Sequence, residues 1–478
     1  MPNIVFIIAD DLGYGDIGAF GQKKIKTPSL DALAGEGIRF TRHYSGNNVC
    51  APSRAVLMTG YHPGHCAVRN NMEVKPEGQC SLPENTATLV GELKKRGYVS
   101  GAFGKWGLGS PDSVSTPLRI GFDRFYGYNC QREAHTYYPA QLWNDEQKIT
   151  VNEHPVPGHA ALDPDDDPND PKSYMKFQGK NYSPDLIAAE IFKFVGKNAE
   201  KPFFLYWATT VPHLALQVPE DSLKEYQGLW DDPPFTGIGK NGYTPHFTPR
   251  AAYAAMITRF DREIGRLVQL LEDKGVYENT LIVFVSDNGP LYDRLGGTDT
   301  EFFNSNAGLR GRKGSMYEGG IRVPCIVSWQ GKIRPNRVSD RVTGFEDWMP
   351  TLLEIADGKP GTAPDDSDGI SFVSTLLAEE DGKIQQDRPF LYRESPGYGG
   401  QQTVIAGDWK LVRTQLTLTK RQGKSLADAP VELFNLAEDS FETTNLAKEY
   451  PGKVIELENL ASGQHVRSTI FPLPLVDN

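Results

Sequence analysis

Cys50 opens the stretch of sequence with the most evident chemical potential, CAPSRAVLMTG. Proline at a first helical position and glycine just past a helical end predict a short helix between Pro52 and Gly60. Cys50 would then lie at the positive end of that helix, where free N–H groups favour an anionic group. A buried structural cysteine before a helix is the alternative, although it would not require Ser53 and Arg54 beside it.

Oxygen-bearing side chains follow two of the predicted buried strands. Asp10 and Asp11 come at the end of the first strand, and Asp287 and Asn288 come at the end of a later one. In open α/β sheets, ligands bind beyond the carboxyl ends of the strands. Carboxylate and carboxamide oxygens suit Ca²⁺ or Mg²⁺ far better than zinc or copper. Each acid alone could simply begin a turn, but two such strand ends together with Cys50 favour a metal site.

Three cationic or titratable side chains follow the same pattern. Lys105 lies in GKWGLG after one strand, Lys313 lies in the glycine-rich run GRKGSMYEGG, and His213 follows another strand in VPH. Glycine neighbours let a lysine approach an anion closely, because the backbone around it takes little room. Taken singly, either lysine could be a solvated surface residue and His213 could be structural.

The elements that must position these residues alternate between short apolar runs and amphipathic stretches, which predicts an α/β fold with a mainly parallel sheet. The predicted buried strands are Ile4–Ala9, Val99–Phe103, Phe203–Ala208 and Leu281–Val285. The predicted helices are Thr86–Arg96 ended by Gly97, Pro184–Val195 capped by Ser183, and Ala252–Lys274 closed by Gly275.

Long irregular segments interrupt this alternation. Residues 144–182 contain an acidic, proline-rich run at 163–171, which we interpret as a solvated loop rather than as a second calcium site. Residues 220–250 form a second long loop, of the kind that often shapes a substrate cleft. Residues 356–388 are rich in Gly, Asp and Pro and predict a linker.

The part of the chain after this linker predicts a small antiparallel α+β module. Its expected elements are the strands Phe390–Arg393, Thr403–Ile405, Lys410–Thr414 and Val431–Phe434 and a helix near Lys453–Ala461. We therefore predict two units, a catalytic α/β domain over residues 1–375 and a C-terminal α+β subdomain over 376–478.

Bulk composition describes an ordinary globular protein of 478 residues with a net charge of -11. That charge argues against nucleic acid or an anionic membrane as a partner, and no apolar run is long enough to span a bilayer. The chain starts almost directly on a strand without a signal peptide, so we expect a periplasmic or secreted protein whose leader is absent from this sequence. A cytoplasmic protein would start in the same way. The five cysteines fit no metal motif, which leaves the redox compartment open.

The motif C-x-P-S-R-x-x-x-x-T-G, matched from Cys50 to Gly60, resembles the signature of the formylglycine-dependent type I sulfatases of the alkaline phosphatase superfamily. The resemblance extends from IVFIIADDLGYGD at residues 4–16 to ELFNL at 432–436 and ETTNL at 442–446. It implies an alkaline phosphatase-like fold, with a large mainly parallel sheet sandwiched by helices and a smaller C-terminal subdomain. It also implies that Cys50 is oxidised to formylglycine by a maturation enzyme.

The resemblance further implies a role for each candidate residue. The calcium ligands would be Asp10, Asp11, Asp287 and Asn288, together with modified Cys50. Arg54 and Lys105 would contact the formylglycine. His213 and Lys313 would bind the sulfate near the leaving oxygen. One hydroxyl of the hydrated aldehyde would attack sulfur, and the alcohol would leave with a proton from His213 or Lys313. Loss of a proton from the second hydroxyl would then expel sulfate and restore the aldehyde.

One position departs from the family pattern. Many members read Gly-Lys-Trp-His-Leu-Gly where this chain has Gly107, and that histidine usually lies beside the formylglycine diol as a base or an orienting group. We predict that His135 fills this space or binds the sugar; an ordinary loop position is the alternative reading of His135.

These observations favour a hydrolase of sulfate esters on carbohydrate, with a sulfated saccharide as substrate. Arg69, Asn70, Tyr138 and Trp143 are candidates for sugar recognition. The alternatives are a formylglycine-dependent phosphodiester or phosphonate-ester hydrolase, and a non-catalytic sulfate-binding relative suggested by Gly107.

Overall fold

A ten-stranded sheet forms the centre of the computed structural model, which describes residues 1–237, 242–377 and 385–477. In spatial order its strands are β11 (Arg337–Ser339), β2 (Ile38–Phe40), β10 (Cys325–Ser328), β9 (Thr280–Ser286), β1 (Asn3–Asp10), β8 (Phe203–Pro212), β4 (Val99–Lys105), β5 (Arg124–Tyr128), β6 (Gln141–Asn144) and β7 (Gln147–Thr150). The central strands β9, β1, β8, β4 and β5 are parallel, whereas β10 pairs antiparallel with β9 and β2, and β6 and β7 form an antiparallel edge. A parallel centre flanked by antiparallel strands is common in large α/β sheets.

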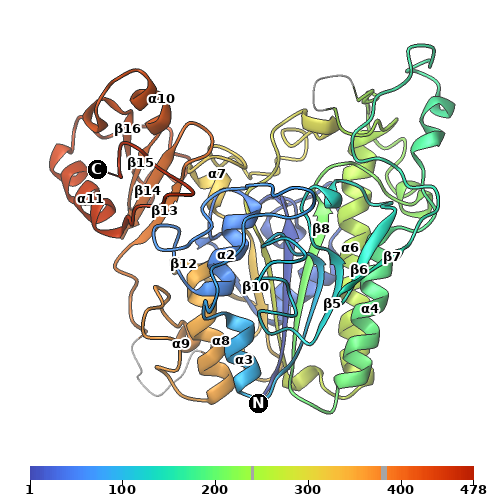
Figure 1. Ribbon diagram of the computed structural model, residues 1–478, viewed down its shortest axis with the longest axis horizontal. Coiled ribbons are helices and arrows are strands. Elements are labelled where there is room, and N and C mark those ends of the chain that lie inside the picture. The colour runs from blue at the N-terminus through green and yellow to red at the C-terminus, as the bar shows by residue number, and fades with distance from the viewer. Residues whose placement is uncertain (238–241, 378–384, 478) are drawn as a thin grey trace.

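Successive residues of β1 point into opposite cores, as the period of a strand requires. Val5 and Ile7 lie in one apolar cluster, and Ile4 and Phe6 lie in the other. The first cluster is covered by α1 (Pro28–Glu36), α4 (Ser183–Asn198) and α6 (Pro249–Asp273), and the second by α2 (Cys50–Thr59), α3 (Leu89–Lys95) and α8 (Trp348–Asp357). Figure 1 shows α4 and α6 on one side of the sheet and α2, α3 and α8 on the other.

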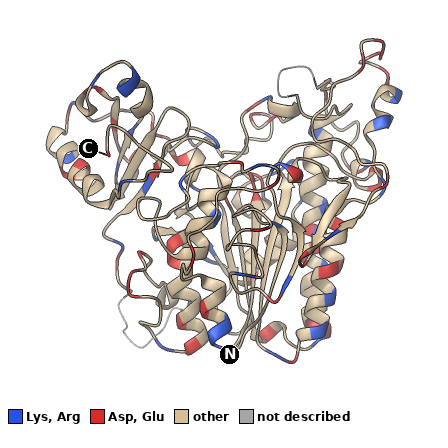
Figure 2. Ribbon diagram, in the orientation of Figure 1, with Lys and Arg blue, Asp and Glu red and all other residues tan. Residues whose placement is uncertain are grey.

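Charged residues follow this layering. In Figure 2 the central strands are almost entirely free of charge along their length, whereas α4 and α6 carry Lys, Arg, Asp and Glu on their outward side. Every residue of β1 and β8 is buried, so a charge within either strand would have to be desolvated, which is costly unless the charge is paired. The one charged residue of these two strands, Asp10, is the last residue of β1.

The C-terminal region forms a four-stranded antiparallel sheet of β13 (Leu391–Ser395), β14 (Gln401–Ala406), β15 (Trp409–Arg413) and β16 (Val431–Asn435). One face packs on α11 (Pro451–Gln464) through Leu457 and Ala461. The other face packs on Tyr44, Met316 and Ile321. This second face therefore rests on the segment that directly follows Lys313, beside the upper left of the main sheet in Figure 1.

Short elements complete the chain. They are α5 (Glu220–Leu223), α7 (Glu318–Ile321), α9 (Val373–Leu377), α10 (Leu416–Arg421), β3 (His43–Tyr44) paired with β12 (Thr343–Gly344), and the 3₁₀ turns Gly18–Phe20, Glu133–His135, Pro171–Phe177, Tyr277–Asn279, Leu295–Gly297, Phe345–Asp347 and Leu426–Asp428. Within the described residues, no helix is both long and apolar enough to cross a bilayer.

The predicted fold class is confirmed, and the four predicted buried strands of the main sheet are each extended by two to four residues. In the C-terminal sheet, β13 and β15 are instead shifted by one or two residues from the predicted Phe390–Arg393 and Lys410–Thr414. Two local predictions are wrong. The helix α2 begins at Cys50 rather than at Pro52, because a proline in the first turn removes only an N–H that has no partner within the helix. Ser183 is the first residue of α4 rather than its cap, and its hydroxyl accepts a hydrogen bond from Tyr128.

Two sequence predictions fall partly outside the described residues, and a third falls within a helix. The predicted loop at 220–250 and linker at 356–388 lie partly outside the described residues, at 238–241 and 378–384. The predicted boundary between residues 375 and 376 falls within α9, whose Leu376 is buried in the second core.

Candidate active site

Four neighbouring strands deliver the predicted polar residues to one edge of the sheet. Asp10 ends β1, Lys105 ends β4, His213 directly follows β8 and Asp287 directly follows β9. Because β9, β1, β8 and β4 are adjacent and parallel, these residues meet at the carboxyl edge, which is the upper edge of the sheet in Figure 1. This is where open α/β sheets bind their ligands.

The Cys50 thiol faces this edge from the first turn of α2. Its side chain is only 1% exposed, and its Sγ lies 3.4 Å from Asp10 Oδ1 and 4.0 Å from Asp11 Oδ1. The next residue, Ala51, donates its N–H to Asn71 Oδ1 at 3.0 Å, which anchors the start of the helix. Burial raises the pKa of the Cys50 thiol well above its usual range, so this thiol is not ionised at neutral pH.

Each carboxylate of the site pairs with one buried cation. The pairs are Lys105 Nζ with Asp10 Oδ2 at 2.6 Å, Lys313 Nζ with Asp11 Oδ2 at 2.8 Å, and Arg54 Nη2 with Asp287 Oδ2 at 2.9 Å. Burial alone would raise the pKa of Asp10, but Lys105, His213 and Arg54 hold it below its usual range. Lys313 also stays charged, because Asp11 raises its pKa against the effect of burial. The edge thus carries three cations that a buried anion can use.

The acidic residues and Cys50 also form a candidate metal centre. Ligand atoms of Asp10, Asp11, Cys50 and Asp287 all lie within 4.8 Å of one another. Asn288 donates from Nδ2 to Asp11 Oδ1 at 2.7 Å, while its own buried Oδ1 has no hydrogen-bond partner among the described residues. Burial and the charge of Asp10 raise the pKa of Asp287 to about 6. Crowded carboxylates beside an unpartnered carboxamide oxygen fit a hard divalent cation such as Ca²⁺ or Mg²⁺.

The tautomer of His213 follows from its hydrogen bond. Its Nδ1 lies 2.8 Å from the carbonyl oxygen of Leu214, which can only accept, so Nδ1 carries a proton. Nε2 therefore faces the site, 3.5 Å from Asp11 Oδ2.

A cavity of about 760 Å³ lies beside this centre. Its wall includes His135, His159 and Tyr243, and His135 stacks on His213 with ring centroids 5.0 Å apart. His135 Nδ1 is also within hydrogen-bonding distance of His159 Nε2, at 2.9 Å. His135 is thus the one predicted substrate residue that lies on this cavity, and it connects the cavity to His213.

The space beside Gly107 belongs to a residue that the sequence did not single out. A Cβ placed on Gly107 would lie 2.7 Å from Gln131 Nε2 and 2.9 Å from Gln131 Cγ. The side chain that fills this space is therefore that of Gln131. His135 lies against His213, and its predicted role beside Gly107 or at the sugar stays a prediction.

The other predicted sugar-binding residues do not line this cavity. Arg69 uses its guanidinium on Glu394 and on the carbonyl oxygens of Cys66, Gly64 and Val466, so it connects the α2 loop to the C-terminal region. Trp143 donates to Glu77, and Tyr138 packs on Tyr182. The described lining of the 760 Å³ cavity includes neither Arg69, Asn70, Tyr138 nor Trp143.

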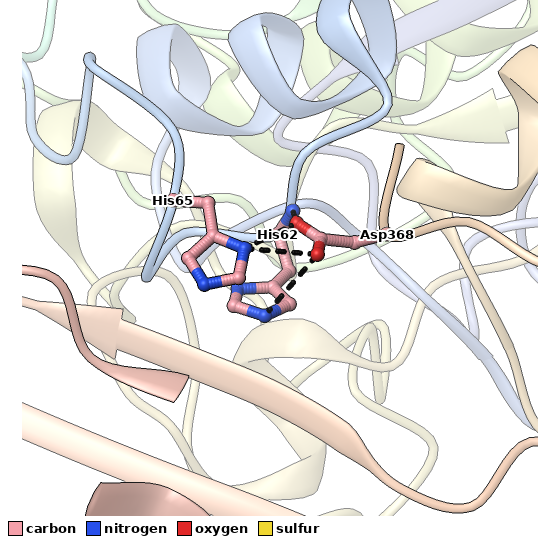
Figure 3. Close-up of side chains that lie close together, drawn as sticks. All are labelled: His62, His65 and Asp368. Carbon is pink, nitrogen blue, oxygen red and sulfur yellow. Dashed lines mark hydrogen bonds and ion pairs between the residues drawn. The ribbon is translucent and has the colours of Figure 1, made fainter. Parts of the chain in front are cut away.

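A second group of potential metal ligands lies between the α2 loop and the loop at Asp368. Figure 3 shows the imidazole rings of His62 and His65 beside the Asp368 carboxylate, and the ring centroids are 4.2 Å apart. His65 Nδ1 lies 2.9 Å from Asp368 Oδ1. His62 Nδ1 accepts the N–H of Gly64 at 3.1 Å, so its proton is on Nε2, which faces Gln464 Oε1 at 3.2 Å.

The fold and this edge of the sheet define an alkaline phosphatase-like α/β hydrolase with a buried acidic and cationic centre. Residues 2–358 match the family model described as Sulfatase, and residues 311–459 match the model described as N-sulphoglucosamine sulphohydrolase, C-terminal. The chain therefore belongs to the sulfatase family, and it is a sulfuric ester hydrolase, as the sequence predicted.

Individual relatives show how far the similarity extends. The N-acetylgalactosamine-6-O-sulfatase of Bacteroides thetaiotaomicron is 29% identical over 98% of this chain and 93% of its own length. The steryl-sulfatase of Mus musculus is 30% identical over 74% of this chain, which spans 62% of that relative's length. The crystal structure of Ps i-CgsB in complex with k-i-k-neocarrahexaose matches with a TM-score of 0.74 and 25% identity, covering 96% of this chain and 91% of that chain.

The residues missed from the sequence lie on loops. Tyr243 falls in the 220–250 segment that was expected to shape a cleft, whereas His159 falls in the 144–182 segment that was interpreted as a solvated loop. Gln131 and Asn71 carry no local signal, because their places depend on packing between distant segments.

Proposed function

We propose that this protein hydrolyses a sulfate ester on a carbohydrate and that Cys50, oxidised to formylglycine, provides the nucleophile. The observation that carries the proposal is the position of Cys50 at the start of α2, within 4.0 Å of two carboxylates and beside three buried cations. The carbohydrate part is supported by the relative that covers nearly the whole chain, an N-acetylgalactosamine-6-O-sulfatase. It is also supported by the neighbouring structure in complex with a neocarrahexaose.

The metal proposed for this site is Ca²⁺, with Mg²⁺ as the alternative. Asp10, Asp11, Asp287, Asn288 and residue 50 would hold it, and the unpartnered Oδ1 of Asn288 supports this set. When bound, the cation would act as a Lewis acid that lowers the pKa of a coordinated hydroxyl and offsets charge on sulfuryl oxygens. Binding would also relieve the mutual repulsion of the three carboxylates.

Formylglycine would supply what a thiol lacks, a hydrated aldehyde with one hydroxyl to attack sulfur and a second to expel sulfate afterwards. The chain's own residues would position that group. Arg54 holds Asp287 through two nitrogens and donates to the carbonyl oxygen of Lys105, which fixes the wall beside residue 50. This fixed geometry would hold the hydroxyl in line with the ester, where correct orientation has its largest effect on rate.

The lysines would change partners when substrate binds. Lys105 and Lys313 now neutralise Asp10 and Asp11. Carboxylates that ligate a cation no longer need these ammonium groups, which would then hold the sulfuryl oxygens. His213 presents Nε2 toward the same place, because Leu214 fixes its Nδ1 proton. His213 or Lys313 would give a proton to the departing alcohol.

The test uses enzyme that carries the modification. Mass spectrometry of the Cys50 peptide establishes the fraction of formylglycine, and the same preparation is assayed on 4-nitrophenyl sulfate, on bis(4-nitrophenyl) phosphate and on defined sulfated saccharides. We expect sulfate release from the aryl sulfate and from at least one saccharide. Faster cleavage of the phosphodiester would instead favour the alternative hydrolase, and binding without turnover would favour a non-catalytic sulfate-binding role.

The proposed function has three consequences for the biology of the chain. A formylglycine-generating maturation enzyme would be a required partner. A sulfated polysaccharide is met outside the cytoplasm, which supports a periplasmic or secreted location that cell fractionation would test. We retain the two-unit division, with catalysis in residues 1–375 and a smaller C-terminal subdomain in 376–478.

A further inference from the structure

Gln131 has a buried side chain whose amide nitrogen makes no hydrogen bond to the described residues. The residue is 7% exposed, and its Nε2 has no hydrogen-bond partner among the described residues. A desolvated N–H without an acceptor destabilises the folded state, so a native structure keeps one where a ligand or water satisfies it. The residue is nevertheless held firmly, because its backbone N–H donates to Gln79 Oε1 at 2.9 Å.

The carboxamide lies against the segment that directly follows β4. It fills the space beside Gly107, two residues beyond Lys105, whose Nζ contacts Asp10. Gly107 has φ of +82°, and a side chain at this position would collide with Gln131. The glycine and the glutamine are therefore complementary, and together they place an amide next to the end of β4.

Gln131 also lines the 760 Å³ cavity whose wall includes His135. Asn71, which accepts the Ala51 N–H, lies on the same cavity wall, and so does His135, which stacks on His213. Because Gln131 and these residues line the same cavity, a molecule bound there lies against the Gln131 side chain. Sulfuryl groups and sugar hydroxyls both offer the oxygen acceptor that this amide lacks.

We propose that Gln131 contacts the substrate, donating from its carboxamide N–H to an oxygen of the sulfate ester held beside Cys50. This inference rests on the proposed function, because it assumes that a sulfated molecule occupies the cavity. A glutamine amide does not titrate at neutral pH, so Gln131 binds and orients the ester and takes no proton from it.

The test compares two substitutions at this position with a matched control. Gln131→Leu removes the donor with little change of volume, and Gln131→Glu keeps the shape but replaces the N–H group with an acceptor. Gln141→Leu, on the exposed side of the β6 edge, is the control. We expect kcat/KM on 4-nitrophenyl sulfate or on the active saccharide to fall about 10- to 100-fold for Gln131→Leu, the size expected for a lost hydrogen bond to a charged or polar substrate. The fall should be at least as large for Gln131→Glu and less than twofold for Gln141→Leu.

The stability of these variants separates a ligand contact from a structural role. Removing an unpartnered buried donor should leave the Tm of Gln131→Leu unchanged or raise it. A lower Tm with unchanged kcat/KM would overturn the inference, and so would Gln131→Glu with parental activity. A loss on both substrates supports the contact at the sulfate ester, whereas a loss on the saccharide alone would place the contact at the sugar and overturn the inference.

Binding provides a readout that does not depend on turnover. In a Cys50→Ala background, calorimetry with the sulfated saccharide that the parent desulfates should show a Kd about tenfold weaker when Gln131→Leu is added. If the parent neither binds nor cleaves any sulfated probe, the proposed function fails. If the parent does both and Gln131→Leu matches it, only this inference fails.

Discussion

Two clusters in this molecule bring potential metal ligands together, and they differ in whether their polar atoms already have hydrogen-bond partners. At the strand ends, Asp10, Asp11, Cys50 and Asp287 crowd three carboxylates around a buried thiol, and the Oδ1 of Asn288 is left without a partner among the described residues. In the His62, His65 and Asp368 cluster the imidazoles have hydrogen-bond partners, and the Nε2 proton of His62 occupies the position that a metal would need.

The difference shows that closeness alone does not make a metal centre. A site for a hard cation needs oxygen lone pairs without a proton or donor on them, and the strand-end cluster offers the unpartnered Oδ1 of Asn288 beside three carboxylates. The histidine cluster instead joins three segments, namely the loop after α2, the loop at Asp368 and the end of α11 at Gln464. We therefore expect the first cluster to determine activity and the second to contribute only to stability.

Loss of Cys50 should have the largest effect on activity. Cys50→Ala should reduce sulfate release by at least about 10⁴-fold, because no other residue can supply the hydrated aldehyde. The fold should persist, since the change removes one buried sulfur atom. Steady-state assay and circular dichroism of the same preparation check both expectations, and residual activity above one-hundredth of the parent would show that another group is the nucleophile.

Removal of a carboxylate from the strand-end cluster should have the next largest effect. Asp11→Asn keeps the size of the side chain and tolerates the left-handed backbone at this position, where φ is +64°. We expect a fall in kcat of about 10²- to 10³-fold together with loss of bound calcium, since each hard ligand contributes to the affinity and charge of the site. Metal analysis of the purified protein measures this.

The matched control for metal content comes from the second cluster. His65→Ala should keep the parental calcium content and bind no less Zn²⁺ than the parent in a direct titration. Stoichiometric Zn²⁺ binding by the parent that His65→Ala abolishes would contradict the distinction between the two clusters.

Loss of one anion-holding cation should come third. Lys313→Met removes the ammonium group next to Asp11 and should lower kcat/KM by about 10²-fold, the scale measured for removing one preorganised donor from a transition-state site. Lys332→Met, at an exposed position, serves as the control. Equal activities of the two variants would remove Lys313 from the proposed site.

The sequence predicts an active-site residue where a local pattern determines the position of that residue in the fold. Asp10, Lys105, His213 and Asp287 were identified because buried parallel strands are recognisable and their carboxyl ends meet at one edge. The contacts of Arg69 with the C-terminal region were not foreseen and Gln131 was not singled out, because each lies in an irregular segment and its position depends on contacts across the fold. The Ser183 cap failed for a related reason, since Tyr128 holds its hydroxyl.

The histidine cluster should respond weakly to substitution. His65→Ala removes a partly exposed pair with Asp368, and such pairs stabilise proteins by about 0.2–1 kcal/mol. Chemical denaturation should therefore show a loss of no more than about 1 kcal/mol, with activity within twofold of the parent. A tenfold loss of activity would mean that this cluster is coupled to catalysis.

The smallest effect concerns pH. Burial lowers the pKa of His62 below its usual value of 6.5, so the unfolded chain binds this proton more readily than the folded one. The contribution of neutral His62 to the free energy of unfolding is therefore fully present above about pH 6.5. This contribution declines as the pH falls toward the pKa of His62 in the folded state. His62→Gln should flatten the fall in stability between pH 7 and 5, as measured by Tm, and an unchanged slope would contradict this assignment.

The most direct test of the central claim relates the chemical state of Cys50 to turnover. Preparations made with graded amounts of the maturation enzyme are analysed for the fraction of formylglycine at residue 50 and for sulfate release per chain, at saturating calcium. We predict that the rate rises in proportion to that fraction and extrapolates to zero when the residue is all thiol. Sulfate release by a preparation that contains only unmodified Cys50 would contradict the account.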